Sequence, residues 1–186
     1  QRTQRIPAFD PELAPIIGRD SHLPSVAEHL FQVSGFRERF SEKKLWNVEL
    51  TDENRSALSA QGAAKAGRGY QPTPAAVLIP MVAYADELRV LLTKRTSHLH
   101  DHPGQISFPG GRTDPEDLSP EHTALREAEE EVGLPSHQVE VLGCLPQYLT
   151  ITGYQVTPVV ALVKPGCQYR PDEFEVAEIF EVPLSF

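Results

Sequence analysis

The stretch "LREAEEEVGL", residues 125–134, places four glutamates within five positions and constrains the fold more than any other segment of this chain. It consists of good helix formers, with no internal proline or glycine before Gly133. Ser119 suits an N-cap, Pro120 suits the first helical position, and Gly133 suits the residue that ends a helix. We therefore predict one helix over residues 119–133.

The predicted helix has two chemically different sides. At about 100° per residue, one apolar side is formed by Leu125, Ala128 and Val132. The other side carries three carboxylates at i, i+3 and i+4: Glu127, Glu130 and Glu131. Like charges at this spacing repel, so the carboxylates form either a solvated acidic face or a site for a hard divalent cation such as Mg²⁺. The helix alone leaves both interpretations open.

Charge and cysteine content exclude several classes of protein. The formal net charge is −9, and the segment 112–131 has eight acids against two bases. Such a chain is a poor non-specific binder of nucleic acid. Cys144 and Cys167 form no C-x-x-C pair, which argues against a zinc ribbon or a disulfide framework. The longest apolar run, residues 75–85, is too short to span a bilayer, and the first ten residues lack the apolar core of a signal peptide. We expect a soluble, cytoplasmic protein without a nucleic-acid or membrane partner.

The chain divides near residue 72. Residues 1–72 are expected to form an N-terminal extension, with one helix over 25–40 that has Gly35 near its end, followed by a flexible linker. Residues 73–186 are expected to form the main domain. Strands are predicted at 75–84, 88–95, 139–145, 154–163 and 178–184, and a short strand ending in a turn at 106–111. Strands on both sides of one helix predict a mixed sheet with helices packed on it, in the α/β (α+β) class.

The glycine pair, acidic loop and helix of residues 109–134 resemble the signature of the Nudix hydrolases. That signature is a glycine, five residues, a glutamate, seven residues and then R-E-U-x-E-E-x-G-U, where U is aliphatic. The matching residues are Gly111, Arg126, Glu127, Ala128, Glu130, Glu131, Gly133 and Leu134. Asp117 replaces the first glutamate, and one extra residue precedes Arg126. The resemblance implies an α/β/α sandwich with a central catalytic helix.

The upstream segment "LLTKRTSHLHDHPGQISFPGG", residues 91–111, resembles the extra motif of the coenzyme A diphosphatase branch. Thr96 and His100 depart from that motif, since the branch has serine or alanine and arginine there. The branch also accepts the Asp117 pattern. This resemblance implies hydrolysis of coenzyme A or acyl-CoA to 3′,5′-ADP and 4′-phosphopantetheine, with Mg²⁺ or Mn²⁺ as cofactor.

The resemblance also assigns roles to individual residues. The expected metal ligands are Glu127, Glu130, Glu131 and the carbonyl of Gly111. The expected catalytic set is Arg126, which orients the glutamates, Glu130, and the general base Glu175, with Glu178 as the second choice for the base. The expected substrate contacts are Lys94, Arg95, His100, Gly104, Gln105, Phe108 and Gly110.

Other functions stay open at this point. The chain could hydrolyse ADP-ribose, NADH or a nucleoside triphosphate, or it could be a catalytically silent Nudix module that senses a nucleotide. The complete set of Arg126 and the helix glutamates favours an enzyme. The histidines of "HLHDH", residues 98–102, suggest a metallo-β-lactamase-like zinc site, but their spacing does not match that motif. A homodimer is allowed, and we expect the C-terminus to be trimmed because family members continue with a further helix.

Overall fold

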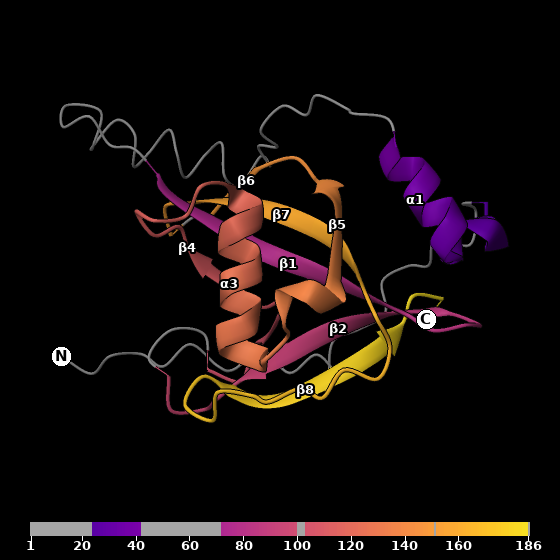
Figure 1. Cartoon of the computed structure of the whole chain (residues 1–186). Coiled ribbons are helices and arrows are strands. Elements are labelled where there is room, and N and C mark those ends of the chain that lie inside the picture. Colours follow the sequence, from indigo (N-terminus) through magenta and orange to yellow (C-terminus); the bar gives the residue numbers. More distant parts are fainter. Residues whose placement is uncertain (1–23, 42–71, 100–102, 151, 186) are drawn as a thin grey trace, which may run out of the picture.

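The computed structural model describes residues 24–41, 72–99, 103–150 and 152–185. These residues form one mixed sheet with helices on both faces (Figure 1). Most of the expected linker lies outside the described residues, as does His100. Within the described ranges, no helix is long and apolar enough to cross a membrane.

The sheet has the strand order β3-β2-β1-β7-β5. These strands are β1 (Thr73–Ala83), β2 (Leu88–Arg95), β3 (Ile106–Ser107), β5 (Val139–Cys144) and β7 (Tyr154–Val163). Three more strands pair off this path: β4 (Gly110–Arg112) with β1, β6 (Tyr148–Leu149) with β7, and β8 (Val176–Pro183) with β2. Strands β1 and β7 are parallel, and the other pairs are antiparallel. The predicted mixed sheet is therefore confirmed.

The predicted central helix is α3 (Pro120–Val132), and local sequence signals set both of its ends. The hydroxyl of Ser119 accepts a hydrogen bond from the backbone N–H of His122 at 3.2 Å. Gly133 adopts a left-handed conformation with φ of 67°, where its N–H donates to Glu129 O at 3.0 Å. Both caps satisfy backbone groups that a helix end leaves unpaired. A short 3₁₀ helix, η4 (Ser136–Gln138), follows and leads into β5.

A hydrophobic core lies on each face of the sheet. On one face, α3 buries Ala124, Ala128 and Val132 against apolar side chains of β1, β2 and β7. On the other face, Met81, Leu88, Val160 and Leu162 pack with Val33, Phe36 and Phe40. The last three residues belong to α1 (Val33–Ser41), so the arrangement is the expected α/β/α sandwich.

The N-terminal helical segment differs from its prediction. It consists of a 3₁₀ turn, η2 (Glu28–Phe31), followed by α1, and Gly35 lies inside α1 rather than near its end. A glycine is needed at this position because the chain packs closely there. A Cβ atom on Gly35 would lie 2.2 Å from the carbonyl oxygen of His29. The guanidinium of Arg37 pairs with the carboxylate of Glu140 through Nε at 3.0 Å and Nη2 at 2.5 Å, which anchors α1 to β5.

Candidate active site

Gly110 and Gly111 lie in strand β4, which corrects the prediction that they form a turn. Gly110 pairs with Val77 and Gly111 with Ala76 on β1. A Cβ atom on Gly110 would lie 2.4 Å from Ala76 O, and one on Gly111 would lie 2.5 Å from the carboxylate of Glu127. The glycines are therefore required because β4 is held tightly between β1 and α3, where no side chain fits.

Glu131 is the buried acid of the site. Its residue is 8% exposed, and its Oε2 accepts a hydrogen bond from Gly110 N at 3.0 Å. The pKa of Glu131 is raised to about 7, mainly by burial and also by the nearby charges of Glu127 and Glu175, while the Gly110 N–H and Arg95 act in the opposite direction. The carboxylates of Glu131 and Glu127 thus lie against Gly110 and Gly111 of β4, and the charges of Glu175 and Arg95 are near enough to act on Glu131.

The loop before β8 brings Glu175 to this position. Asp172 N donates to Glu131 O at 2.9 Å, and Thr96 N donates to Glu175 O at 2.9 Å. The loop is thereby fixed between the C-terminal end of α3 and the end of β2. Glu178, the second choice for the general base, lies exposed within β8 instead. The structure therefore brings Glu175, and not Glu178, together with the helix acids.

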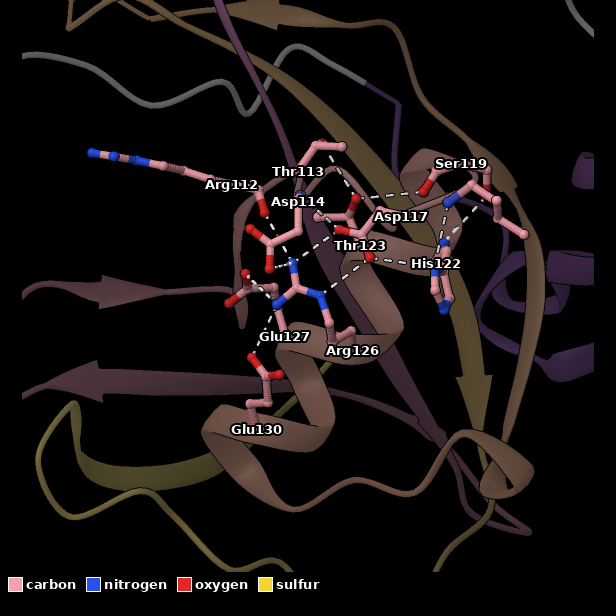
Figure 2. Close-up of polar contacts among 11 residues, drawn as sticks. Arg112, Thr113, Asp114, Asp117, Ser119, His122, Thr123, Arg126, Glu127 and Glu130 are labelled. Atoms are coloured by element: carbon pink, nitrogen blue, oxygen red, sulfur yellow. Dashed lines mark hydrogen bonds and ion pairs between the residues drawn. The ribbon is translucent and has the colours of Figure 1, made fainter.

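Arg126 lies at the centre of a second group of carboxylates (Figure 2). Its Nε and Nη2 bond to Asp117 at 3.1 and 2.9 Å, and Nη2 also donates to Arg112 O at 3.0 Å. Its Nη1 pairs with Glu127 at 2.9 Å and with Glu130 at 3.0 Å. The guanidinium thus links Asp117 to both glutamates, an arrangement suited to orienting them.

Arg126 and Asp117 form an ion pair in which the carboxylate is buried. The side chain of Asp117 is 1% exposed, and the Arg126 guanidinium holds the pKa of that carboxyl well below its usual range. In return, Asp117 raises the pKa of Arg126. The sequence reasoning above missed this role of Asp117. Its position in the Nudix signature was the available signal, because it stands where the signature has its first glutamate.

The three helix glutamates are not equivalent, contrary to the single acidic face expected from the helical wheel. The side chain of Glu127 is 17% exposed and that of Glu130 is 61% exposed, whereas Glu131 is buried. The difference arises because β4 packs along one edge of α3 and covers the side chains nearest to it. Burial is also the main cause that raises the pKa of Glu127.

Carboxylate and carbonyl oxygens are the donors that Mg²⁺ and Mn²⁺ prefer. The missing side chain of Gly111 leaves the space in which the Glu127 carboxylate lies, so the donor types and the packing fit such an ion. In the part of the chain that the structure describes, no three His, Cys, Asp or Glu side chains are already arranged to hold a metal. Arg126 pairs with two of the acids.

A family model of the NUDIX domain matches residues 72–182. The chain belongs to the Nudix family. Among curated relatives, the uncharacterized Nudix hydrolases NudL of Enterobacter sp. (strain 638) and Escherichia coli (strain K12) are each 52% identical over 111 residues. The matched region is 60% of this chain and 57% of either relative, so the chain spans little more than half of their length.

Solved structures agree with the Nudix fold. The Nudix hydrolase RenU from M. smegmatis superposes with a TM-score of 0.51 at 26% identity, covering 61% of this chain and 72% of that protein. A C. elegans Ap4A hydrolase gives a TM-score of 0.50 at 19% identity, covering 57% and 77% respectively. The second likeness concerns the fold alone.

Two of the expected substrate contacts, Lys94 and Arg95, are neighbours at the end of β2. Side chains alternate between the faces of a strand. Arg95 lies on the α3 face, where its Nε is buried and has no hydrogen-bond partner among the described residues. Lys94 is exposed on the opposite face, where Ile106 and Glu178 are its neighbours in the sheet. Lys94 and Arg95, both expected as substrate contacts, therefore lie on opposite faces of the sheet.

The other expected substrate contacts differ in conformation and in exposure. Gly104 has a φ of 71°, a left-handed conformation that favours glycine. Gln105 is exposed, and its carbonyl accepts a hydrogen bond from Arg95 N at 2.9 Å, while Phe108 is half-buried. His100 lies outside the described residues. Among the expected contacts, Gly110 bonds directly to Glu131, and Arg95 lies on the α3 face of the sheet with its Nε buried.

Proposed function

We propose that this Nudix protein hydrolyses the diphosphate linkage of coenzyme A or acyl-CoA to 3′,5′-ADP and 4′-phosphopantetheine. The observation that carries the proposal is the position of the Glu127 and Glu131 carboxylates against β4. Backbone bonds hold the loop of Glu175 between Glu131 and the residue after Arg95. A diphosphate needs positive groups around it, and Arg95 comes from the segment that resembles the coenzyme A motif.

Glu127, Glu130, Glu131 and the Gly111 carbonyl would hold Mg²⁺ or Mn²⁺. When bound, the cation supplies positive charge that offsets the charge of the diphosphate and activates water. In the free protein we propose weak binding, because Glu127 and Glu130 are paired with Arg126 and no complete ligand set is preformed in the described ranges.

Individual residues of the chain would then have separate roles in the reaction. Arg95 presents a planar fork of N–H donors to a phosphate oxygen. Arg126 positions Glu127 and Glu130 from behind and does not contact substrate, since Asp117 occupies two of its nitrogens. Glu175 accepts the proton of the attacking water as the new O–P bond forms and the bond to the bridging oxygen breaks, so that the second phosphate leaves.

A direct comparison of substrates tests the proposal. We expect kcat/KM for coenzyme A to exceed those for dephospho-coenzyme A and ADP-ribose by about tenfold to a hundredfold, the effect of one charge-assisted contact to the 3′-phosphate. Activity should disappear in EDTA. Equal values for the three compounds would contradict selection of coenzyme A. Binding without hydrolysis would instead support a nucleotide-sensing module.

A second candidate is a Nudix hydrolase of another nucleoside diphosphate derivative, such as ADP-ribose or NADH. The departure at His100 favours it, because histidine is mostly neutral near pH 7 and binds phosphate less firmly than the arginine of the motif. Including NADH in the same assay distinguishes this candidate.

A further inference from the structure

An exposed aromatic pair borders the acidic site. The rings of His98 and Phe174 lie 4.9 Å apart between centroids and are tilted by 60°. Phe174 is 64% exposed, although it directly precedes Glu175. A large apolar ring on a loop next to reacting groups is a candidate contact for a substrate.

The backbone under this ring is fixed. Phe174 N donates to Asp172 Oδ1 at 2.8 Å, and the hydroxyl of the buried Thr96 donates to Phe174 O at 2.8 Å. Asp172 N in turn bonds to Glu131 O, which ties the loop to α3. The backbone that carries the exposed ring is therefore held in place relative to α3, and binding would not have to order the loop.

The aromatic pair also lies next to a cation. Arg95 immediately precedes Thr96, and the buried Nε of Arg95 has no partner within the described ranges. The site thus places a flat apolar ring and a guanidinium at the same end of β2. A nucleotide has the matching pair of features, a flat base and a phosphate, joined through one sugar.

We propose that Phe174, supported by His98, stacks against the purine of the substrate while Arg95 binds its phosphate. This inference rests on the proposed function and names which half of the substrate is bound at this place. The pantetheine half is a flexible chain without an aromatic face, so it gains less from a fixed ring.

The experiment measures binding of the two product halves, 3′,5′-ADP and 4′-phosphopantetheine, by isothermal titration calorimetry on the full chain with Mg²⁺. Loss of one stacked base weakens binding by about fivefold to a hundredfold. We expect Phe174→Ala to weaken the binding of 3′,5′-ADP by that factor and to leave the binding of 4′-phosphopantetheine unchanged. Phe174→Trp should retain or strengthen binding of 3′,5′-ADP.

Leu118→Ala is the matched control, because Leu118 is 93% exposed and precedes the N-cap of α3. It should bind both halves as the unaltered protein does. Weaker binding of 4′-phosphopantetheine in Phe174→Ala would assign the ring to the other half and overturn the inference. Equal affinities for 3′,5′-ADP in Phe174→Ala and the unaltered protein would also overturn it, while hydrolysis of coenzyme A would leave the proposed function standing. An unaltered protein that hydrolyses coenzyme A but does not bind 3′,5′-ADP would overturn the inference alone.

Discussion

Replacing Glu131 with glutamine should stabilise the free protein at alkaline pH. Glutamine has nearly the same shape and can still accept the hydrogen bond from Gly110 N, but it carries no charge. The pKa of Glu131 is about 7 in the folded protein against an ordinary value of 4.5. Between these values the folded state holds a proton that the unfolded state has lost, so the free energy of unfolding decreases as pH rises and reaches its full loss above pH 7.

The size of the effect follows from the two pKa values. At about 1.36 kcal/mol per pKa unit, the buried charge destabilises the native protein by up to about 3 kcal/mol above pH 7. Glu131→Gln removes this cost. For a chain of this length, about 2–4 °C per kcal/mol gives an increase in Tm of roughly 6–12 °C. Near pH 4.5 the two proteins should differ little, because Glu131 is then protonated in the folded state and about half protonated in the unfolded state.

The assay is thermal and urea unfolding, followed by circular dichroism in EDTA, at several pH values from 4.5 to 8.5. Glu129→Gln is the control, because Glu129 is exposed on the same helix and its replacement should change stability by less than about 0.5 kcal/mol. Equal or lower stability of Glu131→Gln at pH 8, or a difference that does not depend on pH, would refute the argument from burial.

Three further changes test the carboxylates around Arg126 and Glu131. Glu130→Gln should lower kcat by at least about 10² and leave the unfolding midpoint unchanged, because Glu130 is exposed; full activity of this variant would contradict a metal-ligand role. Glu175→Gln should lower kcat with little change in KM and by more than Glu178→Gln does; the reverse order in steady-state assays would assign the base to Glu178. Asp117→Asn should cost about 1.5–3 kcal/mol at neutral pH in urea unfolding. That loss should shrink below about pH 4, because Arg126 lowers the pKa of Asp117 and the stabilisation disappears as the carboxyl is protonated; a loss of equal size at pH 3 would argue against the ion pair.

The parts of the fold that depend on local signals were predictable from the sequence. The ends of α3 follow from Ser119, Pro120 and Gly133, since capping depends on neighbouring backbone groups only. The glycine pair of β4 instead predicts a turn, because glycine is typical of turns. Glycines are needed at these two positions because β1 and α3 approach β4 closely. These two elements are separate in the sequence and meet only in the folded chain.

The same limit applies to the candidate site. The helical wheel places Glu127, Glu130 and Glu131 together, and their different burial depends on β4. Strand alternation by itself would separate Lys94 from Arg95, because both belong to a segment that the sequence predicts as a strand. The aromatic pair of His98 and Phe174 could not be predicted, since these residues are 76 positions apart and the β2–β8 pairing joins them.

Asp117 and the extra residue before Arg126 are best understood as one compensating change. Aspartate is one methylene shorter than the glutamate of the general Nudix signature, yet Asp117 bonds to two nitrogens of Arg126 and accepts from Asp114 N at 2.9 Å. The extra chain length is available at Leu118, which is almost fully exposed. The shorter side chain and the longer loop together keep the carboxylate in place.

This explanation predicts a rescue. Asp117→Glu alone adds a methylene at a side chain that is 1% exposed, and such overpacking costs about 1–3 kcal/mol. It should also lower kcat by displacing Arg126 from Glu127 and Glu130. Deleting Leu118 in the same protein restores the seven-residue spacing and should recover most of the stability and activity. The measurement is urea unfolding together with steady-state kinetics for both variants. If Asp117→Glu alone matches the native protein, or if the deletion makes it worse, the two departures are independent, because a compensating pair must be tolerated better together than apart.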